Sequence, residues 1–151
     1  MNLTLTRRGD YVVRAALALA RAWGKRPYSK IREVAADMDL PASYTPQVLG
    51  MLGKAGLAEA RAGRDGGYRL TRPPERISML EIVEAAEGPI QLQRCILRGG
   101  PCHVDHACAV HPAWADATER FKRSLTRTTL AHVMRTDRAT HASVPTRNRH
   151  P

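Results

Sequence analysis

The residues in this sequence most able to do chemistry are three cysteines that lie close together. Cys95, Cys102 and Cys108 fall within 14 residues, and the rest of the 151-residue chain has no cysteine. An odd number of cysteines, clustered in one segment, argues against a disulfide framework and favours metal or redox chemistry. The segment runs on to His111 with the spacing Cys-x6-Cys-x5-Cys-x2-His.

The spacing of these cysteines favours one kind of metal site over another. Structural zinc usually binds pairs of cysteines two to four residues apart, because a tight turn presents two sulfurs to one ion. The wider intervals here suit a larger group that is held at several corners, which is an iron–sulfur cluster. A zinc site and three free thiols remain as alternatives.

The charge of the chain is concentrated in its first half. The whole sequence carries 24 Lys and Arg against 14 Asp and Glu, a formal net charge of +10. Residues 1–76 hold 14 basic and 7 acidic side chains, whereas residues 77–136 hold 7 and 6, and residues 137–151 hold 3 and 1. This excess predicts a polyanionic partner, with nucleic acid ahead of an anionic membrane surface.

Several other classes of protein do not fit the sequence. No apolar run approaches the roughly 18–20 residues of a membrane span, and the start lacks the hydrophobic core of a signal peptide. We therefore expect a cytoplasmic protein with no membrane partner. Neither a phosphate-binding glycine loop nor a nucleophile–base signature is present, so an enzyme is not expected.

The basic half has the pattern of three helices. Apolar residues at helical spacing predict a first helix over 7–23 with Thr6 as N-cap, and a short second helix capped by Ser29. A third helix is predicted over 44–55, and a glycine follows it as a stop signal. The inward face of the third helix is expected to hold Val48, Met51, Leu52 and Ala55.

A hairpin is predicted directly after these helices. Residues 57–61 alternate apolar and polar side chains, residues 63–67 form a glycine-rich turn, and residues 68–71 can return as a second strand. Three helices followed by a hairpin with arginines at its tip indicate a winged helix-turn-helix. The predicted fold class is therefore mainly α with a small β-hairpin wing, together with a long dimerisation helix.

The second half is predicted to hold two further helices. Ser78 and Glu81 form a capping box that opens a helix with Met79, Ile82, Val83 and Ala86 buried. A long helix is predicted to begin near Pro112. Its apolar stripe is too sparse for burial within a small domain, so we interpret it as the seam of a homodimer; it consists of Trp114, Ala117, Phe121 and Leu125.

We divide the chain by expected role into three parts. Residues 1–76 form the DNA-binding winged helix-turn-helix, and residues 77–136 hold the cluster-binding loop and the dimerisation helix. Leu130 and Val133 are expected in one further helical turn. From Asp137 the chain is polar and without period, so residues 137–151 are expected to be a disordered basic tail.

A recognition helix presents its first residues to the edges of the bases, while the wing lies along the backbone or in the minor groove. The first turn of the third helix offers one glutamine, which can pair with adenine, and three hydroxyls. We expect double-stranded DNA to be contacted there by Ser43, Tyr44, Thr45 and Gln47, at the wing by Arg61, Arg64 and Arg69, and at the first helix by Arg7 and Arg8.

Taken together, these residues resemble the Rrf family of winged-helix regulators of the iron–sulfur type, which includes IscR-, NsrR- and RirA-like members. The resemblance runs from the start of the first helix through the long helix. No single piece of it is specific, but the set in this order is. It consists of Leu5-Thr6, Gly9-x-Tyr11, Ser43-Tyr44, Leu52-x3-Gly56-Leu57, Gly66-Gly67-Tyr68-x-Leu70, Ile77-Ser78, Glu87-Gly88, the three cysteines and Thr129-Leu130.

The resemblance implies a homodimeric transcriptional repressor whose long helices cross and whose cluster state alters DNA affinity. Cys95, Cys102 and Cys108 would hold the cluster. His111 matches the fourth ligand of IscR-like members with a 2Fe–2S cluster. Asp10 matches the carboxylate that NsrR-like members supply from the partner subunit to a 4Fe–4S cluster. The signal would be nitric oxide, redox state or iron–sulfur status.

Two positions depart from the family pattern. Ala62 stands where many members carry the wing arginine, so Arg61 or Arg64 must supply that contact. Pro46 occupies a site where IscR-like members place an acidic residue that discriminates between target sequences. The operator of those members is therefore not expected here. The alternative function is a zinc- or cluster-binding protein whose helix-turn-helix contacts another protein rather than DNA.

Overall fold

The computed structural model describes the backbone of residues 4–90 and 108–143, with the side chains of the second segment described through Asp137. Cys95 and Cys102 lie outside the described residues. The described elements are α1 (Arg7–Ala22), α2 (Ile31–Asp37), α3 (Thr45–Lys54), β1 (Ala58–Arg61), β2 (Gly67–Leu70), a 3-10 turn η1 (Pro74–Arg76), α4 (Met79–Glu87), α5 (His111–Arg127) and α6 (Leu130–Ser143).

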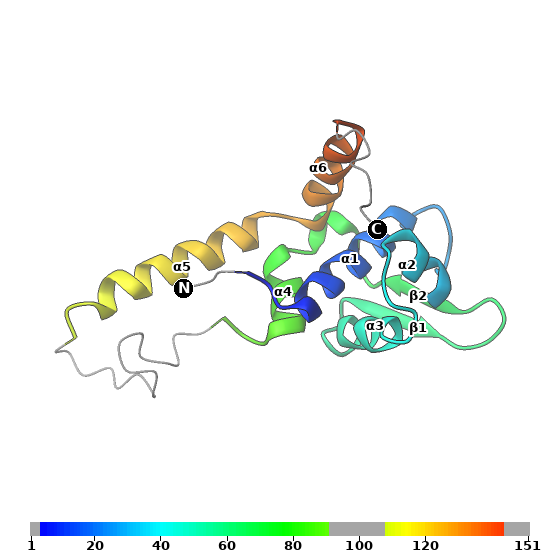
Figure 1. The fold of residues 1–151 in the computed structure, drawn as a ribbon, viewed down its shortest axis with the longest axis horizontal. Coiled ribbons are helices and arrows are strands. Elements are labelled where there is room, and N and C mark those ends of the chain that lie inside the picture. The colour runs from blue at the N-terminus through cyan, green and yellow to red at the C-terminus, as the bar shows by residue number, and fades with distance from the viewer. Residues whose placement is uncertain (1–3, 91–107, 144–151) are drawn as a thin grey trace, which may run out of the picture.

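The first helix lies at the centre of the molecule, with α2, α3, α4 and α6 around it (Figure 1). As predicted, the hydroxyl of Thr6 caps α1 and accepts a hydrogen bond from the Gly9 N–H at 3.2 Å. The apolar positions at helical spacing are buried, with Val12 and Ala15 fully inaccessible. This helix therefore serves as the scaffold on which the DNA-binding elements are mounted.

The predicted cap of the second helix is wrong. Lys30, not Ser29, precedes α2, and the Glu33 carboxylate accepts a hydrogen bond from the Lys30 N–H at 2.8 Å. Ser29 is 4% exposed and exchanges two backbone hydrogen bonds with Tyr68, both of 2.8 Å. Ser29 therefore pairs with β2 at the side of the hairpin, and this pairing satisfies its backbone N–H and carbonyl.

The third helix confirms most of its predicted inward face. Val48 and Leu52 are buried and Met51 is half-buried, but Ala55 is exposed because α3 ends at Lys54. Leu49, which the pattern did not single out, is fully buried. Its burial makes the apolar face of α3 wider than the stripe that the pattern predicts.

The hairpin forms as predicted. β1 and β2 pair antiparallel with Ala58 opposite Leu70 and Arg61 opposite Gly67. Gly67 has a φ of +147° and lies so close to Ser29 that an added Cβ would come within 2.3 Å of its carbonyl oxygen. A glycine is needed at this position because the backbones of β2 and the α1–α2 connection are in direct contact.

One hydrophobic core is shared by both halves of the chain. Its largest fully buried side chains include Leu19 of α1, Leu52 of α3, Ile82 of α4 and Leu130 of α6. Each such side chain contributes roughly 1.5–3 kcal/mol relative to exposure. The packing is therefore continuous across residue 76, where the expected roles of the two parts of the chain divide.

The C-terminal helix is longer than predicted. Beyond the expected turn with Leu130 and Val133, α6 continues through Ser143, so residues 137–143 are helical rather than a tail. Its first turn is anchored because the Leu130 N–H donates to the Ile77 carbonyl at 2.8 Å. Further along, the Asp137 carboxylate pairs with the Arg21 guanidinium of α1 at 2.5 Å. This ion pair connects α6 to α1 beyond the apolar residues of α6.

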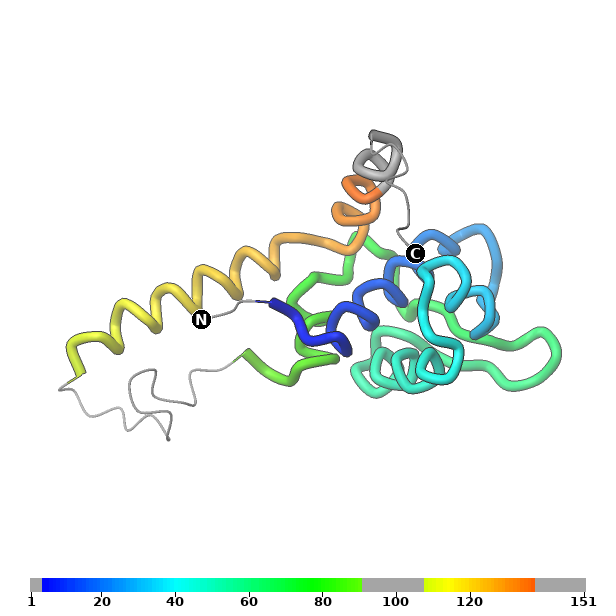
Figure 2. The backbone as a smooth tube through the Cα atoms, viewed as in Figure 1, coloured from blue at the N-terminus to red at the C-terminus, as the bar shows by residue number. Residues whose placement is uncertain are grey.

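The fifth helix leaves the rest of the molecule (Figures 1 and 2). Its 17 residues give a length of about 25 Å. None of them is buried, and Phe121 of the predicted dimer stripe is 45% exposed. Of that stripe, Trp114 and Leu125 are half-buried and Ala117 is exposed. In the described part of the chain, the two middle residues of this stripe are therefore exposed, while those towards its ends are partly covered.

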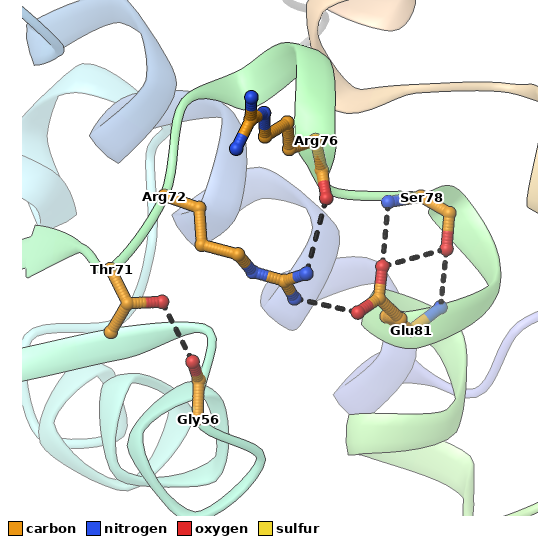
Figure 3. A network of polar contacts seen from close by, with 6 residues as sticks. All are labelled: Gly56, Thr71, Arg72, Arg76, Ser78 and Glu81. Atoms are coloured by element: carbon orange, nitrogen blue, oxygen red, sulfur yellow. Dashed lines mark hydrogen bonds and ion pairs between the residues drawn. The ribbon is translucent and has the colours of Figure 1, made fainter.

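A polar network joins the wing to α4 (Figure 3). The predicted capping box is present, since the Ser78 hydroxyl accepts from the Glu81 N–H at 3.3 Å and the Glu81 carboxylate accepts from the Ser78 N–H at 2.9 Å. Arg72, just after β2, donates to the other oxygen of Glu81 at 2.6 Å and to the Arg76 carbonyl at 3.2 Å. The network fixes the direction in which the chain enters α4.

Glu81 makes the stability of this junction dependent on pH. Partial burial raises the pKa of Glu81, but hydrogen bonds from Arg72 and Ser78 together outweigh it and leave the pKa below its ordinary value. The stabilisation is thus present above the pKa of the unfolded chain and is lost as the pH falls through the lowered pKa of the folded chain.

We expect Glu81→Gln to lower the free energy of unfolding by about 1 kcal/mol at neutral pH, because it replaces the charge-assisted hydrogen bonds of the carboxylate to Arg72 and Ser78 by weaker neutral ones. Urea unfolding followed by circular dichroism measures this difference. The gap between the two proteins should narrow as the pH falls through the lowered pKa of Glu81 in the folded protein. A gap that is independent of pH would show that the carboxylate charge is not involved.

Candidate nucleic-acid interface and metal ligands

At the start of α3, some of the residues predicted to contact DNA are exposed and one is buried. Ser43 and Gln47 are exposed. Thr45 is fully buried, and its hydroxyl donates to the Pro41 carbonyl at 2.9 Å. The prediction that Thr45 contacts DNA is therefore wrong, because its side chain caps the turn before α3 from the inside.

Tyr44 connects the recognition helix to α1. It is the N-cap residue of α3, is half-buried, and its ring packs edge to face on Tyr11 with the centroids 5.9 Å apart and the planes at 61°. Such pairs contribute about 0.5–1.5 kcal/mol beyond the area they bury. The contact holds the first turn of α3, and with it Ser43 and Gln47, in a fixed position on α1.

The three wing arginines are not equivalent. Arg61 and Arg64 are exposed and form no ion pair with any described residue, although the Arg61 guanidinium lies 5.8 Å from the centroid of the Tyr28 ring. Arg69 pairs with Glu59 on the opposite strand at 2.5 Å and lies 4.9 Å from the same ring. Arg61 and Arg64 are thus available to a phosphate, whereas the charge of Arg69 is already balanced.

The arginines at the start of α1 lie apart from the wing. Arg7 is exposed, and Arg8 lies 3.8 Å from the Glu87 carboxylate at the end of α4. Figure 1 shows the first turn of α1 on the side of α4, with the wing at the opposite side of the domain. The structure therefore brings the start of α3 and the wing into one region but does not bring Arg7 there.

Two of the predicted metal ligands meet in one turn at the outer end of α5. Cys108 is half-buried, and His111 is the first residue of the helix. The backbone N–H of His111 donates to the Cys108 carbonyl at 3.2 Å. A thiolate and an imidazole three residues apart suit iron or zinc. No group of three or more potential ligands occurs among the described residues, which exclude 91–107.

Asp10, the other predicted fourth ligand, lies elsewhere. It stands in the first turn of α1 and pairs with Arg14 of the same helix at 3.0 Å. In Figure 1 the start of α1 and the start of α5 lie well apart. Within one chain, Asp10 therefore does not share a site with Cys108 and His111.

Comparison with known proteins identifies the family. Residues 5–136 match the Rrf2 family, described as iron-dependent transcriptional regulators. The chain belongs to the Rrf2 family. The resemblance that the sequence motifs indicated is thereby confirmed. In the described part of this Rrf2 chain, no helix is long and apolar enough to cross a membrane.

Individual Rrf2 relatives agree in sequence and in fold. The transcriptional regulator IscR of Klebsiella pneumoniae (strain 342) is 31% identical over 134 residues, which cover 87% of this chain and 80% of that protein. The structure of IscR from T. potens has a TM-score of 0.68 at 25% identity, covering 97% of this chain and 96% of that one. CymR, the global cysteine regulator of B. subtilis, has a TM-score of 0.72 at 25% identity, covering 89% and 98%.

These relatives establish the general role of the Rrf2 chain. It is a DNA-binding transcriptional regulator with a winged-helix fold, and it is not an enzyme. The family is described as iron-dependent, whereas one structural neighbour is named a cysteine regulator. The signal for this chain therefore has to be argued from its own residues.

The sequence patterns missed residues that shape the wing. Tyr28 lies under two arginines, Glu59 neutralises Arg69, and the Lys30 ammonium donates to the Arg64 carbonyl. The pair of Glu59 and Arg69 could have been found, because a loop over 62–66 places the two directly opposite in the hairpin. Tyr28 carries no local signal, since its partners are more than 30 residues away in the chain.

Proposed function

We propose that this Rrf2 regulator binds an iron–sulfur cluster through Cys95, Cys102 and Cys108, and that it represses transcription in response to nitric oxide, redox state or iron–sulfur status. The observation that carries the proposal is that Cys108 and His111 belong to one hydrogen-bonded backbone turn at the outer end of α5. Thiolates and imidazoles are the protein ligands of such clusters. When bound, a cluster supplies iron and sulfide that react with nitric oxide and oxidants.

Two models for the fourth ligand remain open. In the first, His111 completes a 2Fe–2S site together with the cysteines of its own chain, and its position in the same turn as Cys108 supports this model. In the second, the partner subunit's Asp10 completes a 4Fe–4S site. The separation of α1 from the start of α5 within one chain is compatible only with this intersubunit version of the aspartate model.

The end of α4 offers a physical link between the cysteine segment and the DNA-binding domain. Glu87 is the last residue of α4, and its carboxylate accepts hydrogen bonds from the Thr6 N–H at 3.1 Å and the Thr6 hydroxyl at 2.5 Å. Thr6 in turn caps α1, the scaffold of the recognition helix. A change in the order of the cysteine segment would therefore act on α1 through this contact.

We propose that the uncovered face of α5 is the interface of a homodimer. Exposed apolar side chains in the middle of a helix, here Ala117 and Phe121, are typical of a surface that associates with another chain. In a twofold dimer the two stripes would face each other. Dimerisation also suits DNA recognition, because two copies of α3 could then contact two half-sites of one operator.

Phe121→Asp is expected to convert the dimer to a monomer, because it places a charge in the centre of the apolar stripe. The monomer should stay folded, since Phe121 is 45% exposed in the single chain. Thr126→Asp adds the same charge outside the stripe and should leave the dimer intact. Molar mass from light scattering distinguishes the two. A Phe121→Asp dimer, or a monomeric wild-type protein, would contradict the proposed interface.

The proposal is tested by metal and sulfide analysis of protein purified without oxygen. The expected result is a coloured protein that contains iron and acid-labile sulfide. A colourless protein with one zinc ion would show that the site holds zinc rather than a cluster, and the proposed DNA binding would be unaffected. Absence of any salt-dependent binding to genomic DNA would instead favour a helix-turn-helix that contacts protein.

A further inference from the structure

A second cationic surface lies between the start of α2 and the wing. A cavity of about 650 Å³ opens there. Its lining includes the side chains of Lys30 and Arg32 from the start of α2 and of Arg61 from β1. None of the described residues that line it is acidic. We call this cavity the α2–wing groove.

Backbone contacts hold the two sides of the α2–wing groove together. Ser29 and Tyr68 exchange two hydrogen bonds of 2.8 Å, directly before α2 and within β2. Gly67 packs against the Ser29 carbonyl with no room for a side chain. The Lys30 ammonium donates to the Arg64 carbonyl at the tip of the wing. The groove is thus a formed feature of the domain, with its cations on a rigid frame.

Of the carboxylates near the groove, Glu33 and Glu59 have other partners, whereas Asp65 at the tip of the wing is exposed and is not among the residues that line the groove. Glu33 accepts hydrogen bonds from the Arg26 guanidinium at 2.9 Å and from the Lys30 N–H at 2.8 Å. Glu59 is paired with Arg69. Arg32, in contrast, is exposed and forms no ion pair with any described residue. The uncompensated charge of the groove is therefore positive.

We propose that the α2–wing groove binds a phosphate of the DNA backbone, with Arg32 as the principal ligand and Arg61 across from it. This inference rests on the DNA-binding role of the domain and adds a contact that reads no base. The first helix of a helix-turn-helix crosses the backbone when the second enters the major groove, which brings the start of α2 to a phosphate strand. The planar guanidinium suits a phosphate because it can donate two parallel hydrogen bonds.

The test is a comparison of Arg32→Met with Arg123→Met. Each change removes one exposed arginine and lowers the net charge of the protein by one. Arg123, however, lies on α5, away from the groove (Figure 1). Binding of each protein to a selected operator and to a random duplex is measured by fluorescence anisotropy between about 50 and 200 mM salt. Equal thermal unfolding midpoints check that both variants are folded.

Arg32→Met is expected to weaken binding to both duplexes by about tenfold, because it removes a charge-assisted hydrogen bond. The slope of log K against log salt should fall by about 0.9 for the lost phosphate contact. Arg123→Met should match the wild type. The proposal is overturned if Arg32→Met keeps the wild-type slope and affinity, or if its loss is confined to the operator. A wild-type protein that binds no DNA would overturn the DNA-binding role as well.

Discussion

Cys108→Ala protein purified without oxygen is expected to be colourless, with iron and sulfide at background. An iron–sulfur cluster held by three cysteines loses one corner in this variant, and the chain has no spare thiol to replace it. The fold should be unaffected, because Cys108 is only half-buried and α5 has no buried residue. Iron analysis and the visible spectrum measure the effect, and Cys95→Ala and Cys102→Ala should behave alike.

A matched control lies two residues further along. Val110→Ala alters a side chain that is 40% exposed and has no ligand atom, so it should keep the full iron content. His111→Ala and Asp10→Ala separate the models for the fourth ligand, since only the true ligand should weaken iron binding. Full colour in any one cysteine variant would remove that residue from the ligand set.

The double variant Ser43→Ala/Gln47→Ala is expected to lose most of its preference for the operator. Both side chains are exposed at the start of α3, and a glutamine paired with a base contributes about 1–3 kcal/mol of discrimination. The ratio of operator to random-duplex affinity should therefore fall by roughly 10-fold to 100-fold. An operator selected from random DNA with the wild-type protein supplies the probe.

Thr45→Val serves as the contrasting variant for this prediction. Its hydroxyl is buried on the Pro41 carbonyl, so its loss should lower the unfolding midpoint and leave the base preference unchanged. If Thr45→Val relaxed the base preference and the double variant did not, the assignment of exposed and buried faces of α3 would be wrong.

Local patterns in the sequence predict most of the elements. The Thr6 cap, the capping box of Ser78 and Glu81, and the glycine-rich turn of the hairpin depend on residues at most a few positions apart. Interactions of this range are visible in sequence because the spacing itself carries the geometry. The helix boundaries accordingly differ from the predictions by only one or two residues in α1 and α3.

The errors arise where a partner outside the periodic pattern decides the outcome. Ser29 looks like a helix cap, but β2 takes its backbone groups instead. Thr45 looks like a surface residue at a helix start, but its hydroxyl donates inward to a carbonyl four residues back. The C-terminal helix continues past its apolar residues, and its Asp137 pairs with Arg21, more than 100 residues earlier. None of these contacts has a periodic signal.

The features of the candidate site likewise differ in whether local sequence patterns predict them. Exposure of Gln47 follows from the helical spacing of its buried neighbours, whereas the neutralisation of Arg69 follows from strand register. The α2–wing groove combines residues from two elements that only the folded chain brings together. The cysteines are conspicuous in the sequence, but the turn shared by Cys108 and His111 became visible only in the structure.

The most direct test of the central claim is the affinity for operator DNA, measured without oxygen on one cluster-loaded sample before and after addition of nitric oxide. The visible absorption of the cluster is expected to bleach, and the operator affinity is expected to change in the same titration. Cys108→Ala protein should show neither change. Operator affinity that stays constant while the cluster bleaches would contradict the claim that this regulator senses through its cysteines.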